Sequence, residues 1–349
     1  MFKLRKKPAQ SQGEPLYELI LRWTAKRLHM PRFLSGAFLG LSPLAVGLVL
    51  AYLNGTVIEF LVVSLRLVYW AVILSAFWIM HTIYEVWKDN SHHIRRLVPD
   101  GTSAAASFTV FENIGCQLLC ATVVAAIVAY YYFTLRPSIS SQFVFWYVFA
   151  ALMGAAIAAS FGVYFSLALL HMVRHLSLQE ELNVFQLSPA TTPGILALNY
   201  VCNLWGIAYS LELLIILYGI VAGPWGTTVK TYRLTLAGGA GVISLWTLAH
   251  FFYCHYRIHR MIQREKLRSL EILQSEAAAC SMGGRVANVS EDSLRALDYL
   301  ASSPSIAFGP WWLLRSSFLA ALPWLVVTLS RLAFTRELGK FLLTQFGLR

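Results

Sequence analysis

Residues 241–280 read GVISLWTLAHFFYCHYRIHRMIQREKLRSLEILQSEAAAC, without a proline and with no glycine after Gly241. The first half of this stretch is apolar, and the second half is rich in charged side chains. A helix needs about 20 apolar residues to cross the hydrocarbon core of a bilayer, and charged residues are too costly to stay there. The stretch therefore predicts one continuous helix that leaves a membrane and projects into water.

The composition of the whole chain also indicates a membrane protein. Of the 349 residues, 57% are hydrophobic and 13% are charged, whereas about 25% of residues are charged in an ordinary soluble domain. The formal net charge is +11. Because the basic residues lie beside apolar runs, they match the positive-inside pattern of membrane proteins and not a nucleic-acid-binding surface. We expect membrane lipid as a partner and no nucleic acid.

The apolar runs predict an all-α fold, a polytopic membrane helical bundle with about six spans. We place these spans at about residues 33–53, 57–87, 111–135, 143–172, 195–222 and 234–256. The loops predicted to lie outside hold few basic residues, namely Arg136, Lys230 and Arg233, whereas the other segments are strongly basic. This asymmetry predicts an integral protein of the inner or plasma membrane with both termini in the cytoplasm.

Four segments follow from these boundaries. Residues 1–32 form a basic, amphipathic leader for the cytoplasmic membrane surface, with a plain solvated leader as the alternative. Residues 33–256 form the six-span transmembrane bundle, and residues 257–305 are predicted to fold as a cytoplasmic helical hairpin. Residues 306–349 form a re-entrant or interfacial segment, or a seventh span, with a basic tail. The uncharged part of this last apolar run is only about 22 Å long as a helix, shorter than the core of a bilayer.

Helical periodicity predicts two packing features. In the leader, one apolar face is formed by Leu16, Leu19, Ile20 and Trp23, and we expect this face to lie on the membrane. In the fourth span, small residues recur every four positions at Gly154, Ala158 and Gly162. Small residues on one face let two helix backbones approach closely, so this pattern indicates helix packing and not a binding site.

Two charged residues lie within predicted spans. Arg66 and Glu212 are each about 14 Å from the outer surface at helical rise, and this equal depth predicts an ion pair. Ionisable residues inside a membrane often line a pore, a substrate cavity or a proton path. Asn199, Asn203 and Ser210 form a stripe on the same span as Glu212, on roughly the opposite face. All five residues are therefore permeation candidates, with a structural pair that locks two helices as the alternative.

Histidines form the other notable pattern. Under the six-span topology, all nine fall in the cytoplasmic half of the bilayer or in cytoplasmic segments. Two pairs at i,i+4 spacing present two imidazoles from one helical face, and an adjacent pair lies in a nearby loop. These candidate metal ligands are His171 with His175, His255 with His259, and His92 with His93.

The sequences HMVRH (171–175) and HYRIH (255–259) resemble the HxxxH boxes of membrane fatty-acid desaturases and hydroxylases. That resemblance implies clustered histidines that hold two irons at the cytoplasmic face. However, no HxxHH box is present, and Arg174 and Arg257 place positive charge inside the two boxes. We therefore interpret the histidines as interfacial residues, each with an apolar body and a wet tip. We expect no cofactor, and iron only under the alternative interpretation.

These patterns favour a channel-like or transporter-like protein that moves an ion or a small solute. We expect it to be a homo-oligomer or to assemble with partner membrane subunits. A histidine-box, metal-dependent membrane oxidase or desaturase is one alternative, and a sensor or interaction subunit of a membrane complex is another. The chain contains no GxSxG, P-loop, HExxH or Rossmann glycine motif, so no other catalytic pattern competes with these hypotheses.

Overall fold

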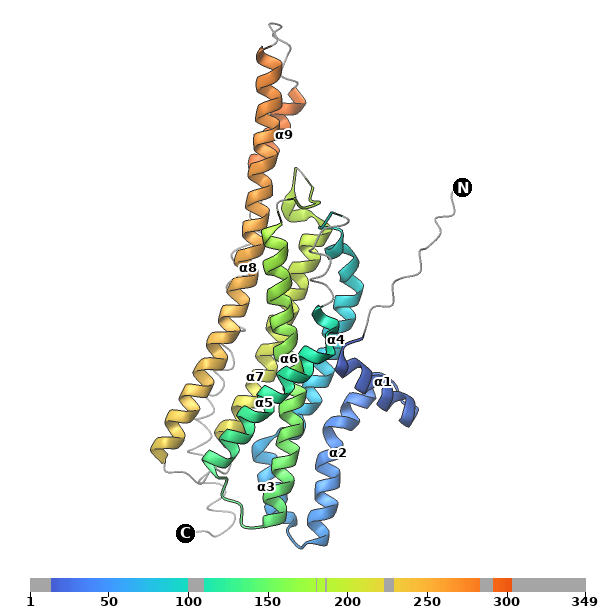
Figure 1. Cartoon of the computed structure of the whole chain (residues 1–349), viewed down its shortest axis with the longest axis vertical. Coiled ribbons are helices and arrows are strands. Elements are labelled where there is room, and N and C mark those ends of the chain that lie inside the picture. The colour runs from blue at the N-terminus through green and yellow to red at the C-terminus, as the bar shows by residue number, and fades with distance from the viewer. Residues whose placement is uncertain are drawn as a thin grey trace, which may run out of the picture.

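Helices make up almost all of the described part of the computed structural model, and no strand occurs there (Figure 1). The structure describes residues 14–99, 110–179, 181–185, 187–222, 229–282 and 291–302. The α-helices are α1 (Leu16–Leu28), α2 (Arg32–Leu53), α3 (Val57–Leu67), α4 (Tyr69–Arg95), α5 (Ile114–Leu135), α6 (Gln142–Leu178), α7 (Pro193–Ala222), α8 (Val229–Met282) and α9 (Glu291–Ser302). The predicted all-α class is confirmed for these residues.

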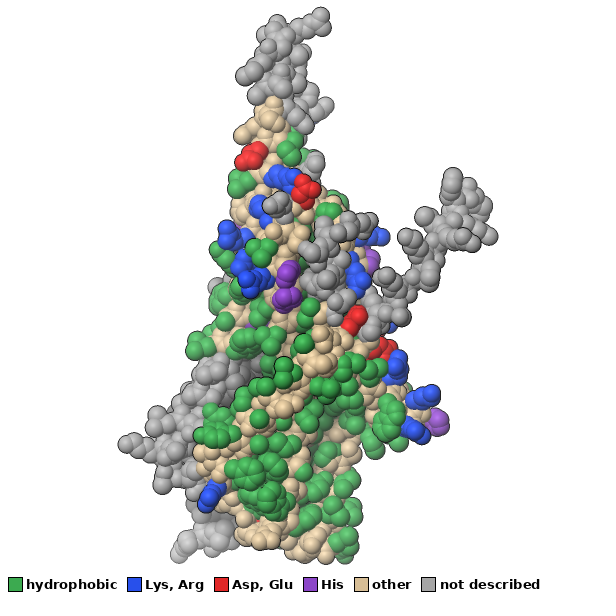
Figure 2. Space-filling model, viewed as in Figure 1, with side chains coloured by type: hydrophobic (Ala, Val, Ile, Leu, Met, Phe, Trp, Pro, Cys, Tyr) green, Lys and Arg blue, Asp and Glu red, His purple; other side chains and the backbone are tan. Residues whose placement is uncertain are grey.

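Five helices in the described ranges are long and apolar enough to cross a membrane, namely α2, α4, α5, α6 and the part of α7 over Pro193–Ile216. In Figure 2, hydrophobic side chains cover the lower part of the molecule, and most charged side chains gather above them. This distribution is that of an integral membrane protein. The sixth predicted span, 234–256, lies within α8. The predicted C-terminal segment, 306–349, lies outside the described residues.

The second predicted span is divided into two helices. Val68 separates α3 from α4 and has φ 46° and ψ 26°, in the left-handed region. A β-branched residue is an outlier in that region, so neighbouring contacts must hold it there. The hydroxyl groups of Ser64 and Tyr69, which flank Val68, lie 3.1 Å apart, and both residues are buried. The prediction of one continuous helix over residues 57–87 is therefore wrong.

The centre of the bundle is formed by α4 and α6. Helix α4 packs against α2, α6 and α7, and α6 also packs against α5 and α8. Close packing depends on small residues at particular positions. A Cβ atom at Gly40 would lie 2.7 Å from the Cα atom of Leu74, so α2 and α4 approach closely there. On α6, Ala158 and Gly162 are buried as predicted, whereas Gly154 is exposed.

Helix α1 lies against the bundle through a face that periodicity did not single out. Its buried residues are Tyr17, Glu18, Leu21 and Thr24, and the amide of Leu16 donates to Oε1 of Gln117 on α5 at 2.8 Å. The predicted apolar face is divided, since Leu16 and Ile20 pack against the core whereas Trp23 is 63% exposed.

Helix α8 is continuous over 54 residues and contains the whole of residues 241–280. The prediction of one uninterrupted helix over this stretch is confirmed. At 1.5 Å per residue it is about 80 Å long, and Figure 1 shows that it extends beyond the other long helices. Helix α9 lies against it, and Nζ of Lys266 donates to the carbonyl oxygen of Ala301 at 3.0 Å.

Candidate functional site

Polar side chains are buried where α6, α7 and α8 meet. We call this group, formed by Glu212, Ser166, His250, Cys254 and Cys202, the polar seam. Glu212 on α7 is 1% exposed, and within the described part of the chain neither of its carboxyl oxygens has a hydrogen-bond partner. Its Oε2 atom faces Gly162 on α6, where a Cβ atom would lie only 3.3 Å away. A glycine at this position therefore leaves room for the carboxyl group inside the bundle.

The rest of the polar seam begins one helical turn further along α6. The hydroxyl group of Ser166 lies 2.7 Å from Nδ1 of His250 on α8. The other ring nitrogen of His250 lies 3.7 Å from the sulfur of Cys254, and Cys202 lies on α7. All four residues are buried. The contacts with Ser166 and Cys254 hold the His250 ring where α6 meets α8.

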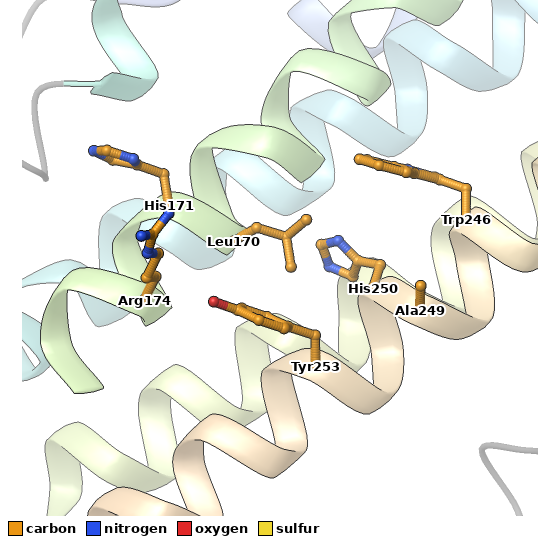
Figure 3. Close-up of a pocket in the computed structure, with 7 residues that line it drawn as sticks. All are labelled: Leu170, His171, Arg174, Trp246, Ala249, His250 and Tyr253. Atoms are coloured by element: carbon orange, nitrogen blue, oxygen red, sulfur yellow. The ribbon is translucent and has the colours of Figure 1, made fainter. Parts of the chain in front are cut away.

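A cavity of about 280 Å³ lies between α6 and α8, next to His250 (Figure 3). Its lining residues are Leu170, His171 and Arg174 from α6 and Trp246, Ala249, His250 and Tyr253 from α8. In Figure 3, Trp246 and Ala249 lie at one end, whereas His171 and Arg174 lie at the other end. None of the described residues that line the cavity is acidic. Its lining therefore combines a cation and hydrogen-bond donors with an apolar end.

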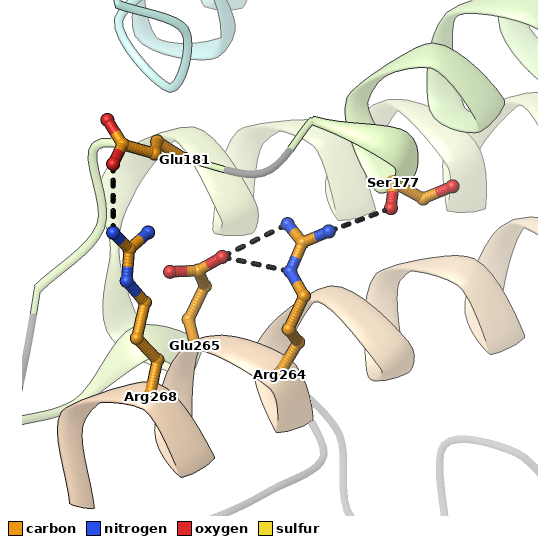
Figure 4. A network of polar contacts seen from close by, with 5 residues as sticks. All are labelled: Ser177, Glu181, Arg264, Glu265 and Arg268. Atoms are coloured by element: carbon orange, nitrogen blue, oxygen red, sulfur yellow. Dashed lines mark hydrogen bonds and ion pairs between the residues drawn. The ribbon is translucent and has the colours of Figure 1, made fainter. Parts of the chain in front are cut away.

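Basic residues anchor the next part of α8 to the end of α6 (Figure 4). Arg264 donates to the carbonyl oxygen of Ser177 at 3.1 Å and forms an ion pair with Glu265 at 3.0 Å. Arg268 pairs with Glu181, in the α6–α7 connection, at 2.9 Å. A cation near the last carbonyl groups of a helix is stabilising, because these groups carry partial negative charge. These contacts hold α8 beside α6 just beyond the cavity.

The structure places the predicted permeation residues on two separate helices. Asn199, Asn203, Ser210 and Glu212 are all buried along α7. The Oδ1 atoms of the two asparagines have no hydrogen-bond partner among the described residues, whereas the Ser210 hydroxyl donates to the carbonyl oxygen of Gly206 at 2.7 Å. Arg66 is instead exposed at the end of α3.

The predicted ion pair between Arg66 and Glu212 is wrong. No ion pair joins them, although both side chains are described, and the Glu212 oxygens have no partner in that part of the chain. Equal depth in the membrane was the basis of the prediction. Depth says nothing of the direction in which a side chain points around its helix axis, and Arg66 points out of the bundle.

The histidine pairs do not combine into a metal site in the described ranges. The rings of His171 and His175 lie 4.3 Å apart, and those of His92 and His93 lie 3.8 Å apart. His255 packs against the ring of Phe251 at 4.3 Å, and His259 is partly buried. No group of three or more His, Cys, Asp or Glu side chains that would hold a metal ion occurs in this part of the chain. A diiron centre needs more converging ligands than these pairs supply.

Sequence reasoning identified Glu212 but missed the rest of the polar seam and the cavity. Ser166, Trp246 and Tyr253 belong to no motif, and only the contact between α6 and α8 brings them together. A weak signal exists, because Gly162 and Ser166 are one turn apart on α6. Comparison with protein families, curated proteins and solved structures found no match to this chain. The functional argument therefore rests on the site itself.

Proposed function

We propose that this chain is a channel-like or transporter-like membrane protein that moves protons, alone or together with a small solute, along the polar seam. In this proposal the first half of α8 is the sixth span, and both termini are cytoplasmic. The extension of α8 and helix α9 then form a cytoplasmic hairpin. The basic residues of α8 beyond the cavity, at Arg257, Arg260, Arg264 and Arg268, support this orientation through the positive-inside rule.

The buried carboxyl group of Glu212 carries the proposal. An ionisable side chain inside a membrane protein is costly to keep there, and such residues commonly mark ion or proton paths. Glu212 is almost completely buried and has no hydrogen-bond partner in the described part of the chain. No cation among the described residues pairs with it, so the group is able to take up and release a proton during transport.

The neighbouring residues of the polar seam suit a proton path. The Ser166 hydroxyl and the His250 imidazole both donate and accept hydrogen bonds, and they lie 2.7 Å apart. Imidazole is the side chain most often used as a proton shuttle. Because His250 also lines the cavity, this pair supports a route from the interior of the bundle to its surface.

Proton flux into proteoliposomes tests the proposal. Purified protein is reconstituted with a pH-sensitive dye inside the vesicles, and a potassium diffusion potential drives protons. We expect Glu212→Gln to lower the flux by at least about tenfold, because the amide cannot exchange a proton. The matched control is Glu181→Gln, which changes an exposed carboxyl group paired with Arg268 and should conduct as wild type does. Equal flux in Glu212→Gln and wild type would contradict the proposal.

Orientation has a separate test. In a background without native cysteines, Ser138→Cys lies in the loop between α5 and α6 and should react with an impermeant maleimide added outside intact cells. Gln10→Cys should react only after the membrane is permeabilised, because positive-inside topology keeps the leader in the cytoplasm. The reverse pattern would overturn the proposed orientation.

A sensor or interaction subunit is a second candidate function. It is favoured by the projecting part of α8, where Leu267 is 57% exposed and Ile272 is 43% exposed. Apolar side chains on a helix that extends away from a bundle offer a surface for a partner or for a second copy of the chain. Size-exclusion chromatography with light scattering, on wild type and on Leu267→Glu, measures whether this surface assembles oligomers. A lower mass for the variant supports the candidate, and an unchanged monomer contradicts it.

A further inference from the structure

Among the described residues that line the cavity between α6 and α8, Arg174 is a cation and none is acidic. Arg174 and His171 lie at its exposed end, and Arg174 forms no ion pair within the described residues. Among the described residues near this part of α6 and α8, the carboxyl groups of Glu181 and Glu265 already pair with Arg268 and Arg264. A hollow lined by one sign of charge concentrates counter-ions, so this end of the cavity attracts an anion.

The opposite end of the cavity is apolar but contains one unused hydrogen-bond donor. Ala249 and the indole ring of Trp246 form this end, and Leu170 lies between the two ends. Nε1 of Trp246 is buried and has no hydrogen-bond acceptor in the described part of the chain. A buried donor without an acceptor is costly, and an oxygen atom of a ligand would relieve that cost. The two ends together fit a molecule with an anionic head, an apolar body and an acceptor oxygen between them.

The position and size of the cavity narrow the choice of ligand. The cavity lies where the apolar part of α8 gives way to the basic run that begins at Arg257, which is the level of lipid head groups in a membrane protein. Its volume of about 280 Å³ is at the lower end of ligand pockets, which hold roughly 300–1,000 Å³. This volume holds a head group and the first carbons of a lipid, while the acyl chains stay in the bilayer.

We propose that this cavity binds the head group of an anionic phospholipid. The phosphate lies against Arg174, His171 and the hydroxyl group of Tyr253, and an ester carbonyl oxygen accepts from Trp246. Arginine suits the phosphate because its guanidinium group donates two parallel hydrogen bonds, and basic pockets between membrane helices are a general mode of head-group recognition. The site goes beyond the proposed proton path and does not depend on it, because lipid binding is measured without transport.

Native mass spectrometry of the full chain in neutral detergent tests this site. The protein is titrated with phosphatidylglycerol and, separately, with zwitterionic phosphatidylcholine. We expect phosphatidylglycerol to bind at least about tenfold more tightly, and Arg174→Gln to remove most of that preference. Trp246→Phe keeps the ring but loses the donor, and it should weaken binding about threefold. The control is Arg260→Gln, which changes an arginine that stacks over Tyr256 outside the cavity and should bind as wild type does.

Three outcomes would overturn the proposal. Equal affinity for the two lipids would remove the anionic preference. Equal losses in Arg174→Gln and Arg260→Gln would show that general surface charge, and not this cavity, attracts the lipid. The third outcome comes from a further titration, in which soluble glycerol 1-phosphate is added as a competitor. If it displaces phosphatidylglycerol at a similar concentration, the site takes a free phosphate ester and the lipid assignment is wrong, whereas failure to compete supports the membrane source. Thermal melting of each variant shows that it is folded.

Discussion

Glu18 and Glu212 are buried in different parts of this bundle, and the surroundings of their carboxyl groups differ sharply. Glu18 on α1 is 0% exposed and Glu212 on α7 is 1% exposed. Oε1 of Glu18 lies 2.8 Å from Nδ1 of His81 on α4, and Oε2 lies 3.6 Å from Arg32 on α2. Glu212 has no such partner among the described residues.

The comparison separates a structural from a functional reason for burying a carboxylate. A buried charge with partners holds elements together, and removing one partner is costly. A buried carboxyl group without partners lowers stability, and its retention calls for another explanation. Burial alone therefore does not single out a candidate site, whereas burial with no partner among the described residues singles out Glu212.

The largest effect is expected at Glu18. Glu18→Gln breaks the contacts of α1 with α2 and α4, and it should lower the free energy of unfolding by about 3 kcal/mol. Thermal unfolding in detergent measures this loss. Glu14→Gln is the control, because Glu14 pairs with Arg22 at the surface of the same region and such pairs contribute under about 1 kcal/mol. Equal melting of the two variants would mean that the Glu18 contacts do not hold α1.

A smaller effect is expected from adding one methyl group at each of two glycines. In Gly40→Ala the new Cβ atom meets the backbone of Leu74 at 2.7 Å, and helices α2 and α4 must move apart, at a cost of about 2 kcal/mol. In Gly162→Ala it meets the Glu212 side chain at 3.3 Å, which turns aside at a cost below about 1 kcal/mol. Chemical or thermal unfolding measures the stability of the two variants. A larger loss of stability in Gly162→Ala than in Gly40→Ala would contradict this ranking.

The smallest effect on stability is expected at Glu212. Glu212→Gln removes a buried ionisable group that has no partner in the described residues, so the variant should melt at or slightly above wild type, by up to about 1 kcal/mol. The same melting assay measures this change beside Glu18→Gln. A loss as large as that in Glu18→Gln would reveal a structural partner for Glu212 and end the contrast between the two sites.

Much of the architecture could be predicted from the sequence, because long apolar runs admit few structures in a membrane. The continuous helix over residues 241–280 follows from an apolar half, a charged half and the absence of breaking residues. The break at Val68 could not be predicted, since neither glycine nor proline lies near it. A hydrogen bond between the side chains of Ser64 and Tyr69, which flank Val68, accompanies this break.

The candidate site was predicted only in part. Glu212 was identified because a charge inside an apolar run is visible in the sequence, but its partner was assigned wrongly from depth alone. The buried face of α1 was missed for a similar reason, since Glu18 is polar and its burial depends on His81 and Arg32 from other helices. The cavity joins two helices whose lining residues lie more than 70 positions apart, and no periodicity within one helix reveals it.

Labelling with dicyclohexylcarbodiimide tests the central contrast most directly. This apolar reagent reaches carboxyl groups from within the membrane and adds to their protonated form as an N-acylurea. Glu212 should be labelled and proton flux should fall in parallel, whereas Glu18, held by His81 and Arg32, should stay unlabelled in the folded protein. Peptide mass spectrometry locates the label. Labelling of Glu18 without Glu212, or full labelling of Glu212 with unchanged flux, would contradict the account.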